Sequence, residues 1–314
     1  MRLAGLLALL GLLAVMASGC SDSEPASAGE IAQRKVRVTT TTNFITDTVR
    51  QIGGDRVEVT GLMGPGVDPH LYKATAGDVR TLGGADVIFY GGLELEGKMA
   101  DLLDKLAARQ PTQAVTAGIP EADLLDPPEG APESEQHDPH VWFDVTNWVH
   151  VSDTIAARLA EVDPAHADVY RANRDAYVRR LRALDTEVAQ RMQRIPRAQR
   201  VLVTSHDAFH YFGNRYDVDV AAIQGISTAA EATTADIERV AALLARRNVR
   251  SVFIESSVPK QTIEAVLAAT RKRGHDAQIG GELFTDAAGD EGTPEGTYIG
   301  MVRHNAQAIE EGLR

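Results

Sequence analysis

The segment Asp138-Pro139-His140-Val141-Trp142-Phe143-Asp144 presents a histidine directly after a proline turn and ahead of apolar and aromatic residues. Its opening tripeptide occurs once before, in Asp68-Pro69-His70-Leu71-Tyr72. Proline fixes φ and has no backbone N–H, so a histidine behind it is held in a defined direction. Two ordinary Asp-Pro turns would give the same pattern. With that alternative open, we treat His70 and His140 as candidate halves of one metal site.

The composition is that of an ordinary soluble protein and argues against a nucleic-acid partner. The chain has 314 residues, enough for about two domains of ~150 residues each. Aromatic residues make up 5% of the chain, too few for a large surface on which nucleic-acid bases could stack. The net charge is −12, and no cluster of Lys and Arg that could bind phosphates stands out. An acidic exterior suits a cationic ligand, although it equally serves solubility.

Residues 1–19 have the pattern of a secretory signal peptide. A short positive start precedes an uncharged apolar run over 3–16 and the small residues Ala17-Ser18-Gly19. The apolar run is shorter than the ~20 residues that a membrane-spanning helix needs, and no later segment of the sequence qualifies. We therefore expect an extracytoplasmic protein.

Cys20 is the only cysteine, which excludes an internal disulfide and a cysteine-rich zinc site. Its position after Ala-Ser-Gly resembles a bacterial lipobox, in which the signal is cut before the cysteine and the thiol receives diacylglycerol. Acylation of the new amino terminus usually supplies the further chain that stable anchoring requires. An incidental cysteine after an ordinary signal is the alternative. We expect a lipid anchor at Cys20 on a bacterial membrane, in the periplasm or on the outer cell face, and a flexible tether over 20–34.

Short β-branched runs alternate with helical patterns in both halves of the mature chain, which predicts an α/β fold with mainly parallel sheets. We expect two similar lobes, 35–162 and 197–314, each with a roughly four-stranded sheet flanked by helices. The predicted strands are 36–40, 57–62, 87–90, 113–115, 201–204, 218–223, 252–255 and 277–279. The predicted helices are 44–52, 76–82, 95–108, 235–247, 261–273 and 301–313.

A single long helix over 163–196 is expected to join the lobes. Asp163-Pro164 supplies a start signal and Pro196 a stop. The apolar residues fall mostly three or four apart, on one face: Tyr170, Tyr177, Leu181, Leu184, Val188, Met192 and Ile195. A helix of this length spans ~45 Å, so it is a stiff connector that lets the lobes rock slightly.

Two further candidate ligands follow predicted strands in the second half. His206 comes after the buried run 201–204, and Asp286 lies in the loop after 277–279. Open α/β sheets bind ligands at the carboxyl ends of their strands. Three imidazoles and one carboxylate, from His70, His140, His206 and Asp286, suit Zn²⁺ or Mn²⁺.

The chain resembles the TroA-like or ZnuA-like metal-binding lipoproteins that serve ABC importers of zinc and manganese. This resemblance spans the mature chain and rests on 64–70, 138–144, 204–209, Glu255-Ser256-Ser257, 283–286 and Gly296-Thr297-Tyr298. It implies two α/β lobes joined by a long helix, with the metal between them and His70, His140, His206 and Asp286 as ligands. It also implies an ABC membrane permease as partner, no enzymatic activity, and a monomer as the default state.

The sequence departs from the family pattern at two places that bear on the metal. Zinc-specific members often carry a long His-rich loop ahead of the second turn, whereas the acidic loop here holds only His137. Manganese members typically have Glu where this chain has His206. Nitrogen-rich ligation favours Zn²⁺ over Mn²⁺, so we favour zinc by a small margin.

Three glutamates resemble family positions near the site: Glu231, Glu255 and Glu282. Each could accept the second N–H of a ligating histidine and so orient its ring. A helix-capping or surface role is the alternative for each.

Two other functions fit parts of the sequence. The pattern His206-Asp207-Ala208-Phe209-His210 resembles the His-Glu-x-x-His helix of zinc proteases, which makes a secreted zinc-dependent hydrolase one alternative. However, Asp replaces the Glu that acts as general base, and four protein ligands would close the position that a catalytic water needs. A metal-binding adhesion lipoprotein is the other alternative, for which no dedicated surface is evident.

Overall fold

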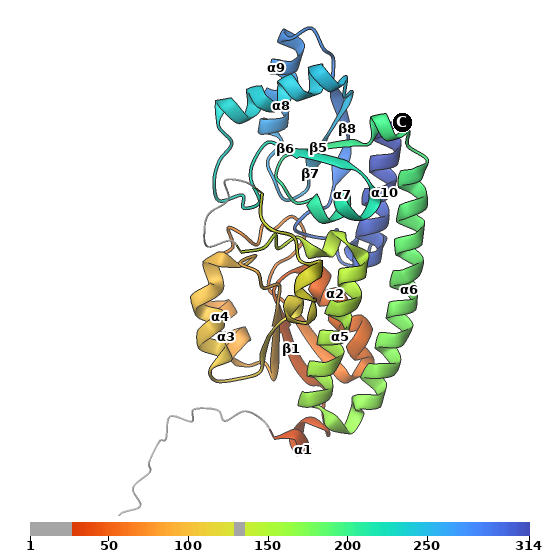
Figure 1. The fold of residues 1–314 in the computed structure, drawn as a ribbon. Helices are drawn as coiled ribbons and strands as arrows, with labels where there is room; N and C mark the ends of the chain where they lie inside the picture. Colours follow the sequence, from red (N-terminus) through yellow and green to blue (C-terminus); the bar gives the residue numbers. More distant parts are fainter. Residues whose placement is uncertain (1–26, 129–135) are drawn as a thin grey trace, which may run out of the picture.

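The computed structural model describes residues 27–128 and 136–314. Two lobes stack along one long helix, with the first lobe below and the second above in the view of Figure 1. The α/β fold class, the two lobes and the long helix between them are confirmed. Among the described residues, no helix combines the length and the apolar character that crossing a membrane requires.

The first lobe is built on a four-stranded parallel sheet in the order β2-β1-β3-β4. Its strands agree with the predicted ones to within one residue: β1 Val36–Thr40, β2 Val57–Gly61, β3 Val87–Tyr90 and β4 Thr112–Ala114. Its helices are α2 Asn43–Gly53, α3 Ala76–Gly83, α4 Ala100–Ala107 and α5 Val145–Val162.

Strand β3 shows how the sheet is covered on both faces. Successive side chains of a strand point to opposite faces. Val87 and Phe89 therefore join the large core, which also contains buried residues of α2 and α5. Ile88 points the other way, into a smaller core of Met63, Leu82, Met99 and Leu103 that α3 and α4 help to form.

The second lobe contains two parallel strand pairs rather than one continuous four-stranded sheet. Strands β5 Val201–Thr204 and β6 Asp219–Ala222 form one pair, and β7 Ser251–Glu255 and β8 Gln278–Leu283 form the other. Strands β5 and β7 lie next to each other. The helices are α7 His210–Tyr216, α8 Thr234–Arg247, α9 Gln261–Lys272 and α10 Tyr298–Leu313.

A single long helix joins the lobes, as expected, and it forms a hairpin with the last helix of the first lobe. Helix α6, Ala167–Gln193, is preceded by a 3₁₀ turn at Pro164–His166 and packs along α5. The sequence did carry the signal for α5: Asp144 caps its first turn by accepting from the Thr146 N–H, and Trp148, Val151 and Ile155 are buried at helical spacing.

One hydrophobic cluster runs through both lobes along this hairpin. It includes Phe44 of α2, Trp148 of α5, Leu184 of α6, Phe253 of β7 and Met301 of α10. Helix α10 packs against β8 and also against α6 and α2 (Figure 1). Because the lobes share a core on this side, the strand-end loops of both are held opposite each other.

Part of the segment expected to be a flexible tether, residues 20–34, is folded against the first lobe. A short helix, α1 Ala28–Ile31, begins with a capping box between Ser27 and Glu30, and Ile31 is buried. Arg34 pairs with Asp86 at 2.6 Å. Residues 27–34 therefore lie against the first lobe, whereas the predicted signal peptide, Cys20 and the rest of the tether lie outside the described residues.

Candidate metal centre

The structure brings the four predicted ligands together at the junction of the lobes. One potential ligand atom from each of His70, His140, His206 and Asp286 lies within 4.8 Å of the others. His70 follows β2, His140 precedes α5, His206 follows β5 and Asp286 follows β8. His70 is 5% exposed and the other three are fully buried.

The carboxylate of Asp286 faces the imidazoles of both lobes. Its Oδ1 lies 3.6 Å from Nε2 of His140, and its Oδ2 lies 3.4 Å from Nε2 of His206. The ring of His70 has its centroid 5.5 Å from that of His140 and 6.2 Å from that of His206. Neighbouring Nε2 and carboxylate atoms thus surround one small volume.

These inward-facing atoms have no hydrogen-bond partner among the described residues. The set comprises Nε2 of His70, His140 and His206 and both carboxylate oxygens of Asp286. Leaving a buried polar atom unpaired costs ~1–3 kcal/mol, so native proteins rarely gather several in one place. A cation that accepts their lone pairs would satisfy them together, and imidazole nitrogen with carboxylate oxygen is a donor set suited to Zn²⁺.

Asp138 fixes the ring of His140. Its Oδ1 accepts the backbone N–H of His140 at 2.9 Å and lies 2.7 Å from the ring Nδ1. A hydrogen bond at Nδ1 favours the tautomer that leaves a lone pair on Nε2. Asp138 was not among the predicted site residues. Its role could have been inferred from its position two residues before His140, because Asp side chains in turns often accept the backbone N–H two residues later.

Glu255, the last residue of β7, holds His206 in the same manner. Its Oε1 accepts the backbone N–H groups of Ser205 at 2.7 Å and His206 at 2.9 Å, and its Oε2 contacts Nδ1 of His206. Of the three glutamates considered as orienting partners, Glu255 is therefore the one that the structure places beside a candidate ligand.

The other two glutamates lie elsewhere. The side chains of Glu231 and Glu282 are exposed, and neither has a hydrogen bond to a site histidine. Glu231 lies in the loop before α8, and Glu282 lies in β8, where alternation turns its side chain outward. The expectation that they orient a ligating histidine is corrected accordingly.

His70 is tied to the second lobe through Asp68. The Asp68 carboxylate accepts the backbone N–H of His70 at 2.9 Å and the hydroxyl of Thr228 at 2.5 Å. Thr228 precedes α8 in the second lobe, so this carboxylate bridges the lobes. Trp142 and Phe143, which follow His140, are buried in the large core.

The electrostatics favour a divalent cation. Asp138, Glu255 and Asp286 place three buried carboxyl groups beside the imidazoles. Burial lowers the pKa of His70 to about 3, which keeps that imidazole neutral. Burial alone would raise the pKa of Asp286, but attraction to His206 lowers it well below its usual value. In the metal-free protein a proton on His206 offsets part of this negative charge, and a bound dication would take over that role beside the carboxylates.

His210 is not part of this cluster. It begins α7, and its Nε2 lies 3.0 Å from Asp207 while its Nδ1 lies 3.6 Å from Asp138. The two histidines of the His206-Asp207-Ala208-Phe209-His210 pattern therefore do not face one ion, as those of a His-Glu-x-x-His helix do.

Comparisons with known proteins agree with this architecture. The family model of ZnuA, described as zinc-uptake complex component A, periplasmic, matches residues 38–312. The chain is 43% identical to the manganese-binding lipoprotein MntA of Bacillus subtilis over 310 residues, 99% of each chain. It is also 43% identical to the zinc-binding protein TroA of Treponema pallidum over 312 residues, which cover 99% of this chain and 98% of that one.

The fold is similar to solved structures as well. The periplasmic zinc-binding protein TroA from Treponema pallidum superposes with a TM-score of 0.85 at 46% identity, covering 89% of this chain and 99% of that chain.

Proposed function

Since the chain belongs to the ZnuA family of periplasmic zinc-uptake components, we propose that it is the extracytoplasmic receptor that captures a divalent metal ion for an ABC importer. Proteins of this family are solute-binding components of transport systems and not enzymes. The metal is the cargo, and the chain carries out no covalent chemistry. A membrane permease is the partner to which the ion passes.

The convergence of buried, unpaired ligand atoms from four separate loops supports this function most strongly. We assign His70, His140, His206 and Asp286 as the ligands. Asp138 and Glu255 orient the imidazoles of His140 and His206 by holding their Nδ1 atoms. Four protein ligands leave no open position for a catalytic water, so the site suits binding and transfer rather than hydrolysis.

The relatives do not separate the two candidate metals. MntA is named manganese-binding and TroA zinc-binding, at the same 43% identity to this chain. Three imidazoles with one carboxylate form a nitrogen-rich set, which favours Zn²⁺ by intrinsic affinity. We therefore propose Zn²⁺ as the preferred ion and Mn²⁺ as the competitor.

The anchoring and organisation of the chain are further parts of the proposal. Cys20 carries a lipid that holds the protein at a bacterial membrane, consistent with relatives that are named lipoproteins. The chain works as a monomer with lobes at 35–162 and 197–314. The expected linking segment 163–196 contains α6 and its preceding turn.

A competition titration tests the function. The protein without residues 1–20 is stripped of metal and titrated with Zn²⁺ and Mn²⁺, singly and together, at neutral pH. We expect one ion per chain, with Zn²⁺ bound more tightly, and loss of tight binding in His140→Ala. Preference for Mn²⁺ would overturn the choice of ion, and failure to bind either ion would overturn the receptor function.

A further inference from the structure

Asp286 differs from His140 and His206 in how its side chain is held. Those two histidines each have a buried carboxylate on Nδ1, from Asp138 and Glu255. The carboxylate oxygens of Asp286 accept no hydrogen bond from the described residues. The orientation of this carboxylate therefore depends on the backbone that carries it.

Two side chains of the first lobe hold that backbone on either side of Asp286. On one side, the indole N–H of Trp142 donates to the carbonyl of Thr285 at 3.1 Å. On the other, Asn43 makes a reciprocal pair with Ala288: its Nδ2 donates to the carbonyl at 2.8 Å, and its Oδ1 accepts the N–H at 2.8 Å. Using both ends of the amide fixes the orientation of Asn43 and of the loop together.

Two further polar residues of α2 contact the segment that follows Ala288. Asn43, Asp47 and Arg50 lie three or four residues apart and so share one face of the helix. Asp47 accepts the backbone N–H of Tyr298 at 2.9 Å, and Arg50 pairs with Glu291 at 2.6 Å. Helix α2 thus contacts the segment from Ala288 to Tyr298 at three successive points.

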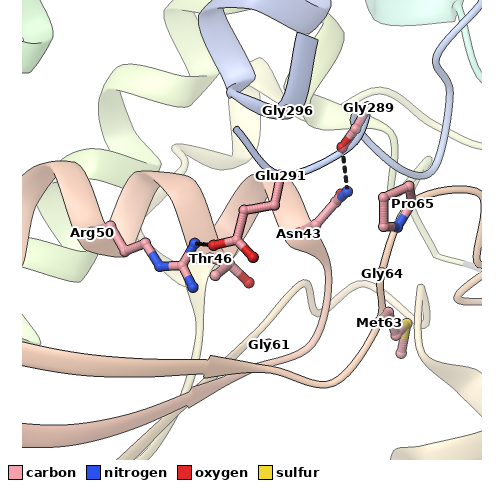
Figure 2. A pocket seen from close by; sticks show the side chains of 10 residues that line it. All are labelled: Asn43, Thr46, Arg50, Gly61, Met63, Gly64, Pro65, Gly289, Glu291 and Gly296. Atoms are coloured by element: carbon pink, nitrogen blue, oxygen red, sulfur yellow. Dashed lines mark hydrogen bonds and ion pairs between the residues drawn. The ribbon is translucent and has the colours of Figure 1, made fainter. Parts of the chain in front are cut away.

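Where α2 meets this loop, the hydrogen bonds of Asn43 add direction to apolar packing, because Phe44 of α2 and Ala288 belong to the same core. A cavity of about 140 Å³ lies there, lined among others by Asn43, Thr46, Met63 and Gly289 (Figure 2). Figure 2 also shows the Asn43 amide reaching towards Gly289, whose carbonyl is 3.5 Å from Nδ2. Beside this space, the paired hydrogen bonds of Asn43 fix the direction of the Ala288 backbone.

We propose that Asn43 is a positioning residue for Asp286: across the lobe junction, it fixes the loop that presents this ligand to the metal. This inference rests on the proposed function and names a residue that governs the affinity of the same site. Asn43 touches no metal ligand atom itself and acts through the backbone of Ala288, two residues from Asp286.

Variants of Asn43 can be made without removing a cap of α2. Thr42 occupies the N-cap position, and no side chain makes the capping hydrogen bond there. Asn43→Ala removes both hydrogen bonds to Ala288. Asn43→Asp keeps an oxygen that accepts the N–H of Ala288, but it loses the amide N–H that donates to the carbonyl of Ala288. Arg50→Ala is the matched control, because it breaks a more exposed contact on the same face of α2.

Zn²⁺ affinity and release are measured for all of these proteins, the release rate by mixing with excess chelator. Loss of an orienting partner typically costs 10–100-fold in metal affinity, so we expect Asn43→Ala to bind about 10–100-fold more weakly. We expect Asn43→Asp to fall between Asn43→Ala and the unmodified protein, and Arg50→Ala to match the unmodified protein. An Asn43→Ala variant that binds as tightly as Arg50→Ala would overturn the assignment.

A double-mutant cycle separates positioning of Asp286 from general damage. If Asn43 acts through Asp286, then Asn43→Ala has no further effect on affinity once Asp286→Ala is present. An equal loss in both backgrounds would show a purely structural role and overturn the inference. Absence of Zn²⁺ and Mn²⁺ binding by the unmodified protein would instead reject the proposed function, so the two failures are distinguishable.

Discussion

Nδ1 of His140 lies 2.7 Å from Oδ1 of Asp138, and both side chains are fully buried. Burial alone would raise the pKa of Asp138, but attraction to His140 lowers it to about 2. The carboxylate is therefore charged at all physiological pH values. A charged partner on Nδ1 raises the basicity of the ligating Nε2 and fixes its direction.

Asp138→Asn is expected to weaken Zn²⁺ binding by about 10–100-fold, because the amide can still accept a hydrogen bond but has no charge. The dissociation constant from a competition titration checks this. Glu231→Gln is the control: it removes an exposed carboxylate that contacts no site histidine, and we expect its affinity to be unchanged. Equal affinities for the two variants would contradict the orienting role of Asp138.

Metal binding should weaken as the pH falls. Burial lowers the pKa of His206, but Asp286 and Glu255 outweigh it and raise that pKa well above the usual value in the metal-free protein. A metal must therefore displace a proton from His206 below this raised pKa. We expect the dissociation constant for Zn²⁺ to rise about tenfold per pH unit there. A dissociation constant that stays constant from about pH 7.5 down to about pH 5, a range that brackets the ordinary His pKa, would contradict this linkage.

His210→Ala separates a receptor from a zinc hydrolase of the His-Glu-x-x-His type. In such a hydrolase both histidines bind the metal, so the variant would lose it. Here His210 lies beside Asp207 and Asp138, outside the four-residue cluster. We expect His210→Ala to keep one Zn²⁺ per chain and His206→Ala to lose tight binding, as measured by metal analysis after dialysis. If both His210→Ala and His206→Ala lost the metal, the result would favour the zinc-hydrolase alternative.

The strands and the ligands were predictable because their signals are local. Val36–Thr40 and Val87–Tyr90 are short β-branched or aromatic runs, and the structure has them at the predicted bounds. The candidate ligands were found because each follows a strand or a proline turn. Helix α5 was not predicted, because Asp144, which caps it, also ends the conspicuous segment 138–144.

The partners of the ligands were harder to predict because they are distant in sequence. Glu255 is 49 residues from His206, and Asn43 is 245 residues from Ala288. Glu255 and His206 meet because β5 and β7 lie next to each other in the second lobe, whereas Asn43 and Ala288 meet where the two lobes pack. Glu231 and Glu282 matched family positions equally well, yet their side chains face solvent. Asp138 was the exception, since it acts on its own turn and could have been inferred from it.

Cys20→Ala tests the lipid anchor. Without the thiol no diacylglycerol can be attached at this position. We expect the variant to move from the membrane fraction to the soluble fraction of cells, while Zn²⁺ affinity stays the same. Retention at the membrane would show that another part of the chain holds it there.

Leu184→Ala on α6 tests whether the lobes depend on one core. Leu184 is 1% exposed and belongs to the cluster that spans both lobes, so its truncation should lower the free energy of unfolding by about 2–5 kcal/mol. Val169→Ala on the same helix is the matched control, because Val169 is 40% exposed and its loss should cost much less. Chemical denaturation followed by tryptophan fluorescence gives both values.

The same experiment shows how far the lobes can act independently. Trp142 and Trp148 report on the shared core, whereas far-ultraviolet circular dichroism reports on helices of both lobes. If one core holds both lobes, the two signals change together in a single transition, and Leu184→Ala shifts both midpoints by the same amount. Separate transitions, with only one shifted, would mean that each lobe has its own core. In that case the lobes could part far more widely than a shared hydrophobic cluster allows.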